Sequence, residues 1–82
     1  MPIHSPKDLA LFVIDQRKKL KLSQTEVGKL VGLKQQTISA FELKPEGTKL
    51  STLFSILSAL HLDIKVLTKN DTNSKILWKE EW

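Results

Sequence analysis

A short segment after Gly32 carries side chains that could hydrogen-bond to the edges of nucleic-acid bases. Lys34, Gln35, Gln36 and Ser39 share one polar face if the segment is helical. Glutamine can both donate to and accept from adenine, lysine can donate to guanine, and serine can do either. We therefore predict base reading by these four residues. The alternatives are a solvated helix face that binds nothing and, for Lys34, a contact to phosphate.

The charge of the chain favours a polyanionic partner. The formal net charge is +4, and residues 17–49 hold eight Lys or Arg against three acids. Such a basic concentration is typical of proteins that bind nucleic acid, but a solvated lysine surface has the same composition. The predicted contacts to the DNA backbone are Gln24, Thr25, Thr37, Lys44 and Lys49. Gln24 and Thr25 begin a predicted helix, whose free N–H groups can meet a phosphate.

Four predicted helices must position these side chains. Residues 5–20 begin with a Ser-Pro-Lys-Asp start signal, and residues 23–31 begin with a capping box of Ser23 and Glu26. A third helix begins near residue 34 or 35, and a fourth runs from about residue 51 with apolar residues at helical spacing. Gly32, between the second and third, suits the left-handed position that ends a helix. Two short helices joined in this way predict a helix-turn-helix.

The period of the pattern changes after the fourth helix. Apolar Leu62, Ile64 and Val66 alternate with other residues over 62–67, which predicts a short β-strand. Nothing else in the chain predicts a strand, so we expect this one to pair with its copy in a homodimer. The alternatives are an extended tail and a dimer interface on the helices that includes Phe54. We predict a domain over residues 1–68 for DNA binding and dimerisation, followed by a flexible tail over 69–82.

The sequence resembles the phage-repressor and Xre-like helix-turn-helix family over residues 7 to about 61. Within that family it is most similar to the HipB-type antitoxins, through SPKDLA, LKQQTISAFE, LSTLFSILSALHLDIKVL and the terminal EEW. The resemblance implies an all-α, lambda-repressor-like domain of four main helices, followed by the strand that pairs across the dimer. It also implies a buried structural ion pair between Arg17 and Glu42.

The same resemblance implies a function. A HipB-type antitoxin is a dimeric autorepressor that binds palindromic operator DNA and neutralises a HipA-like serine/threonine kinase toxin. Trp82, a terminal aromatic ring beside a free carboxylate, is the residue we expect to contact the toxin. The alternatives are a phage-type repressor without a toxin and an interaction module that does not bind DNA. A kinase-like gene beside this one would favour the antitoxin.

Other classes of function find little support in the sequence. There is no cysteine, the two histidines His4 and His61 lie far apart, and no glycine-rich phosphate loop is present. We therefore expect no catalysis, no metal and no cofactor. No apolar run is long enough to cross a bilayer, and no signal peptide is evident, so we expect a cytoplasmic protein that associates with the nucleoid when bound to DNA.

Overall fold

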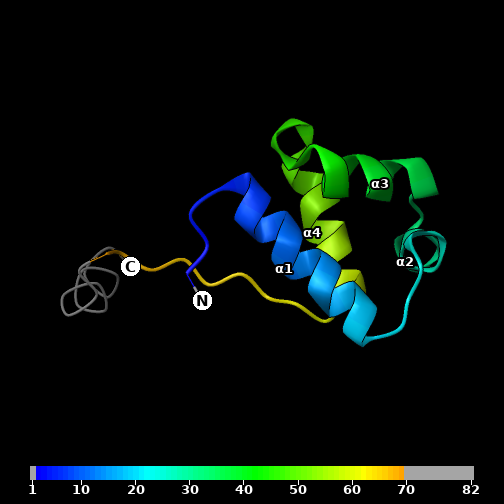
Figure 1. The fold of residues 1–82 in the computed structure, drawn as a ribbon, viewed down its shortest axis with the longest axis horizontal. Coiled ribbons are helices and arrows are strands. Elements are labelled where there is room, and N and C mark those ends of the chain that lie inside the picture. The colour runs from blue at the N-terminus through cyan, green and yellow to red at the C-terminus, as the bar shows by residue number, and fades with distance from the viewer. Residues whose placement is uncertain (1, 70–82) are drawn as a thin grey trace, which may run out of the picture.

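The computed structural model describes residues 2–69, and within that range the chain forms four α-helices. They are α1 (Pro6–Lys19), α2 (Gln24–Val31), α3 (Gln35–Leu43) and α4 (Leu50–Ala59), with a 3-10 turn η1 (Pro45–Gly47) before α4. Figure 1 shows α1 and α4 crossing at the centre, with α2 and α3 beside them. The predicted all-α class and the four helices are confirmed, although α4 begins at Leu50 rather than at residue 51.

Serine side chains begin the first two helices. The Ser5 hydroxyl accepts from the Asp8 N–H, and the Ser23 hydroxyl accepts from the Glu26 N–H. The Glu26 carboxylate accepts from the Ser23 N–H, which completes a capping box, and this backbone bond lowers the pKa of Glu26. In α1 no such box forms, because the carboxylate of Asp8 accepts from the N–H of His4 rather than from the N–H of Ser5.

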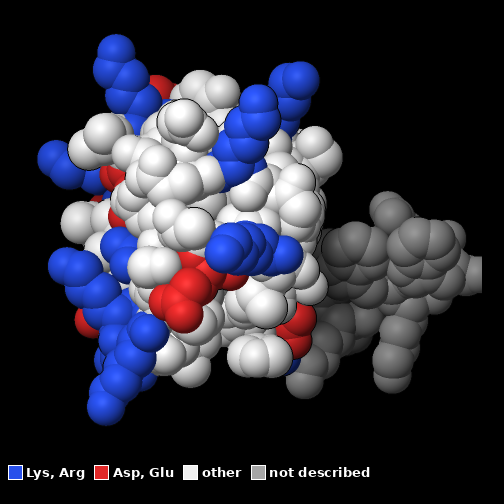
Figure 2. All heavy atoms as spheres, turned by 90° about the vertical axis from the view of Figure 1, so that its right-hand side faces the viewer, with Lys and Arg blue, Asp and Glu red and all other residues white. Residues whose placement is uncertain are grey.

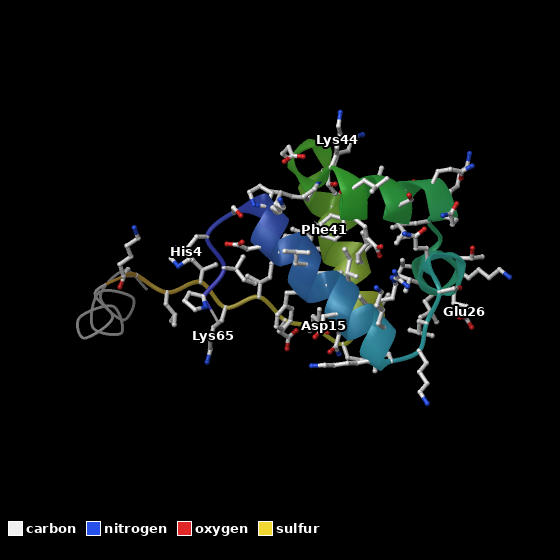
Figure 3. The ribbon with its side chains drawn as sticks, viewed as in Figure 1. His4, Asp15, Glu26, Phe41, Lys44 and Lys65 are labelled. Carbon is white, nitrogen blue, oxygen red and sulfur yellow. The ribbon has the colours of Figure 1, made fainter. Side chains whose placement is uncertain are left out.

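The core is built from the apolar stripes of all four helices. Its largest fully buried side chains belong to α1, α2, α3, α4 and the C-cap of α4: Val13, Val27, Ile38, Phe41, Ile56 and Leu60. Figure 3 shows Phe41 directed from α3 toward α1. Burying each such side chain contributes about 1.5–3 kcal/mol relative to leaving it in water. This core therefore fixes the angle at which α3 is held against the rest of the domain.

The turn between α2 and α3 depends on two glycines. Gly32 is the C-cap of α2 and has a φ of 72°, in the left-handed region that side chains with a Cβ rarely adopt. Gly28 is buried where α2 meets the turn, and a Cβ at that position would lie 2.4 Å from the Leu33 carbonyl oxygen. The Leu33 N–H donates to the Gly28 carbonyl at 2.8 Å. The turn is thus pressed against the backbone of α2.

The segment after α4 runs back along the domain without regular structure. In Figure 1 it passes beneath α1 toward the N-terminal residues. Within residues 2–69 no β-strand is formed, and residues 62–67 lie outside any helix. Since a single chain holds no copy of itself, the strand pairing across a dimer stays a prediction. The predicted tail lies almost wholly outside the described residues, as does Trp82.

Candidate nucleic-acid interface

The beginning of α3 presents polar side chains to solvent and apolar ones to the core. Lys34 is the N-cap, and Lys34, Gln35 and Gln36 are exposed, whereas Ile38 and Phe41 on the opposite face are each 1% exposed. Ser39 is half-buried, one turn further along the helix. The structure therefore places the four predicted base-reading residues at one end of α3. Because Ile38 and Phe41 are buried, α3 cannot rotate about its axis without exposing them, and the polar residues therefore stay on the solvent side.

A chain of side-chain hydrogen bonds runs beneath this face. Arg17 on α1 donates from Nε to Oε2 of Glu42 at 2.7 Å and from Nη2 to Oε1 at 3.1 Å. Gln24 Nε2 donates to the same Oε1 at 2.9 Å, and Gln35 Nε2 donates to Gln24 Oε1 at 2.6 Å. Arg17 Nη1 also donates to the Leu22 carbonyl at 2.9 Å. These bonds connect α1, α2, α3 and the loop before α2.

The expected pair of Arg17 and Glu42 is thus present and largely buried. Their side chains are 13% and 7% exposed. Removing one partner from a buried pair typically costs about 3–5 kcal/mol, because it leaves the other charge uncompensated. Both oxygens of Glu42 are occupied, and no polar side-chain atom that is buried among residues 2–69 lacks a hydrogen-bond partner. The network is therefore fully satisfied.

A shallow groove of about 370 Å³ separates α3 from the beginning of α4. Gln36, Thr37 and Lys49 were predicted from the sequence to contact DNA, and all three line it. Its other lining residues are Ala40, Gly47, Thr48 and Thr52. The sequence reasoning did not single out Thr48 and Thr52, although both lie near the start of a predicted helix, where free N–H groups are found.

Two helices begin at lysines along this region. Lys34 and Lys49 are the N-caps of α3 and α4, and neither helix start receives a side-chain cap. A helix N-terminus carries partial positive charge and unpaired N–H groups, so a cationic residue there is unfavourable without an anion nearby. The serine-capped starts of α1 and α2 differ in this respect. The starts of α3 and α4 therefore have the donors and the charge to hold a phosphate.

Positive charge surrounds this end of the molecule. Figure 2 faces the side of Figure 1 on which α2 and the beginning of α3 lie, and Lys and Arg side chains project around a mostly uncharged surface. A small group of acidic side chains lies among them. The predicted backbone contacts Thr25 and Lys44 are exposed, and Lys44 points outward at the end of α3 in Figure 3. No described hydrogen bond or ion pair joins either side chain to the groove.

The predicted dimerisation residues lie away from α3. Ile64 and Val66 are 44% and 78% exposed, whereas Leu62 is half-buried and packs against the core of its own chain. A cavity of about 730 Å³ lies where this segment meets Phe12 and the N-terminal residues. Phe54, the alternative interface residue, is 55% exposed. Ile64, Val66 and Phe54 are thus accessible to a second chain, and the position of the dimer interface stays a prediction.

Two short helices joined by a glycine turn, the second with a buried apolar face and an exposed polar end, define a helix-turn-helix domain. The helix-turn-helix family model, HTH_3, matches residues 13–67, so the chain belongs to that family. No helix within residues 2–69 has the length and apolar character to cross a membrane.

Within the family the chain is similar to proteins known as antitoxins. Antitoxin HipB of Escherichia coli K12 is 42% identical over 62 residues, which cover 76% of this chain and 70% of that protein. Antitoxin HipB of E. coli O6:H1 is also 42% identical, and the match spans 66% of its length. Antitoxin HigA1 of Mycobacterium tuberculosis H37Rv is 40% identical over 60 residues, which cover 73% of this chain and 40% of HigA1.

Solved structures of HipB have the same fold. A HipB–O4 20mer complex and a HipA–HipB–O2–O3 complex each align with a TM-score of 0.82 and 37% identity. Each alignment covers 85% of this chain and 99% of the other.

Proposed function

We propose that this protein is a sequence-specific DNA-binding autorepressor and the antitoxin of a type II toxin–antitoxin pair, whose toxin is a HipA-like serine/threonine kinase. The observation that carries the DNA-binding part is the end of α3, where Lys34, Gln35 and Gln36 are exposed above a satisfied hydrogen-bond network. Similarity to HipB, including a HipB chain in complex with HipA, supports the kinase as the second partner.

On DNA, the N-terminal end of α3 enters the major groove and brings Gln35, Gln36 and Ser39 to the base edges. Lys34 reaches guanine or the adjoining phosphate. Side chains of α2, α3 and α4 and their caps bind the DNA backbone on both sides of the groove and fix the register of the protein on the DNA. The residues expected to do so are Gln24, Thr25, Thr37, Lys44 and Lys49. The uncapped starts of α3 and α4 would each gain a counter-charge from a bound phosphate.

The active unit is a homodimer. Ile64 and Val66 are exposed apolar side chains on a segment outside the helices, and pairing it with its copy would reduce their exposure. A two-fold axis between chains presents two α3 helices and matches a palindromic operator. Binding of the HipA-like kinase is assigned to the tail and Trp82, and the protein acts without catalysis or cofactor, in the cytoplasm and on the nucleoid.

The alternative is a phage-type repressor of the same fold that has no toxin partner. It would bind DNA equally well, so only a toxin-binding measurement separates the two. Isothermal calorimetry of the full chain with a HipA-like kinase encoded beside it should give tight binding. No detectable heat with a kinase shown to be folded and active would favour the repressor without a toxin.

The DNA-binding part is tested by a mobility-shift series with the promoter of the protein's own gene. Several phosphate contacts release counterions, so affinity should fall steeply between low and physiological salt, with a log–log slope of about −0.9 for each phosphate neutralised. A DNA of equal length with scrambled sequence is the control and should bind only weakly. Equal affinity for both DNAs, or no dependence on salt, would contradict the proposal.

A further inference from the structure

Two opposite charges alternate with apolar residues along the segment after α4. Asp63 and Lys65 are exposed, and within residues 2–69 neither of them forms an ion pair. We propose that they pair between two copies of the chain, so that each Asp63 lies opposite the Lys65 of the other copy. The proposal rests on the proposed function, in which residues 62–67 join a homodimer. It assigns the register of that pairing and the charges that select a second copy as the partner.

The segment has open space beside it. Cavities of about 630 and 730 Å³ border it, one against Phe54 of α4 and the other against Phe12 of α1. Leu62 and Ile64 line both cavities, and Ile64 is 44% exposed. Lys65 projects away from the helices in Figure 3. A second strand laid along the segment would therefore cover apolar surface and meet charged side chains.

The symmetry of a dimer limits how a strand can pair with its own copy. A two-fold axis brings the same segment of both chains together, either antiparallel or parallel and in register. Parallel pairing in register would place Asp63 beside Asp63 and Lys65 beside Lys65. Like charges directly opposite each other destabilise a pair of strands. The charges of this segment therefore favour the antiparallel arrangement.

Among the antiparallel registers, one matches every side chain of the segment. With Ile64 opposite Ile64, Asp63 lies opposite Lys65 twice and Leu62 lies opposite Val66 twice. A shift of one residue would set charged residues opposite apolar ones, because side chains alternate between the two faces. A shift of two residues would set Asp63 opposite Asp63, or Lys65 opposite Lys65. The two-fold axis therefore passes through the pair of Ile64 residues.

This register makes the interface selective for a second copy of the chain. Because of the two-fold symmetry, the pair of Asp63 and Lys65 occurs twice in each dimer. A strand from another helix-turn-helix protein that lacks this order of charges would lose both pairs. One pair of opposite charges across two strands changes an equilibrium constant by up to about fivefold. The two pairs together should favour a second copy by about tenfold.

Cysteine cross-linking measures the register, because the chain has no cysteine of its own. A disulfide requires Cα atoms about 4.4–6.8 Å apart, which is the separation of directly opposite residues on antiparallel strands. Under mild oxidation the full chain with Ile64→Cys should therefore cross-link to its copy. Val66→Cys is the matched control on the same face, and it should not cross-link, because the two Val66 residues would lie about 14 Å apart.

The position of the cross-link separates two kinds of failure. Cross-linking of Asp63→Cys or Lys65→Cys in place of Ile64→Cys would overturn the register but keep the strand interface of the proposed function. A dimer that remains intact in sedimentation but cross-links at no residue of 62–67 would overturn the strand interface itself, and the charge pair with it.

Charge reversal tests the pair. Asp63→Lys should raise the Kd of the dimer by more than about tenfold, because two attractions become two repulsions, and Lys65→Asp should do the same. The double variant should return to within about twofold of the original Kd. Glu46→Lys is the matched control, since it makes the same change in net charge at an exposed residue of η1, and it should leave the Kd within about twofold. A double variant that dimerises as weakly as the single variants would overturn the charge pair, even if Ile64→Cys cross-links.

Discussion

Replacing Gly28 with alanine should destabilise the domain, against the usual effect of this change in a helix. Alanine is favoured over glycine inside helices by about 0.8–1 kcal/mol, so at an open position the substitution stabilises. Here the added Cβ would lie 2.4 Å from the carbonyl oxygen of Leu33 and 3.2 Å from its carbonyl carbon. Both atoms belong to backbone, which cannot move aside as the end of a flexible side chain could.

The size of the destabilisation in Gly28→Ala follows from the movement that the added Cβ forces on the turn. The turn has to move away from α2 until the Cβ fits, which stretches the 2.8 Å bond from the Leu33 N–H to the Gly28 carbonyl and displaces Leu33 from the core. Overpacking of this kind costs about 1–3 kcal/mol, and the weakened hydrogen bond adds about 1 kcal/mol. After the gain in helix propensity, we expect a net loss of about 2 kcal/mol in the free energy of unfolding.

Thermal and urea unfolding followed by circular dichroism measure this loss. For a domain of this size it corresponds to a fall in Tm of roughly 10 °C. Gly47→Ala is the matched control, because a Cβ there meets nothing within 4 Å, and it should cost little or nothing. If Gly28→Ala were as stable as the original chain, the close approach of the turn to α2 would be refuted. The variant should also bind DNA more weakly, since the turn positions α3.

Three further predictions concern DNA binding, dimerisation and toxin binding. Gln35→Ala or Gln36→Ala should weaken operator binding by about 1–3 kcal/mol and relax base preference, whereas Lys49→Ala should weaken all sequences alike; retained specificity in the glutamine variants would mean that the reading face lies elsewhere. Ile64→Lys combined with Val66→Lys should give monomers in sedimentation, while Leu30→Lys, also at an exposed apolar residue, should not; an undiminished dimer would move the interface to the helices. Deleting residues 79–82 should leave operator binding unchanged and weaken kinase binding by calorimetry; unaltered kinase affinity would exclude Trp82 as an anchor.

Much of the fold follows from local signals in the sequence. Ser5 and Ser23 cap the first two helices because each needs only a partner three residues away. The helix-turn-helix was predictable because Gly32 lies between two segments whose apolar residues recur at helical spacing. The start of α4 was harder to predict, because its N-cap residue, Lys49, makes no side-chain capping bond. At Asp8, the carboxylate accepts from the N–H of His4, and the sequence carries no signal for that bond.

The contacts that organise the reading face were beyond sequence reasoning. Gln24 was expected to touch phosphate, and nothing in its position indicated bonds to Glu42 and Gln35, which are eighteen and eleven residues away. Those bonds exist because the core sets α2 and α3 at a particular angle, and a side-chain bond requires an accuracy of a few tenths of an ångström. The resemblance implied the ion pair of Arg17 and Glu42, but not the third partner.

The hydrogen bond from Gln24 to Glu42 bears on why a charged pair, Arg17 and Glu42, occupies this position. A buried ion pair is often no more stabilising than apolar side chains of the same volume, because both charges must be desolvated. If Arg17 and Glu42 served only to join α1 to α3, two packed apolar residues would do as well. An apolar residue at position 42, however, could not accept a hydrogen bond from the side-chain amide of Gln24. The carboxylate of Glu42 accepts that bond, and the guanidinium of Arg17 holds the carboxylate in place. The pair therefore joins α1 to α3 and also fixes the side chain of Gln24 at the start of α2.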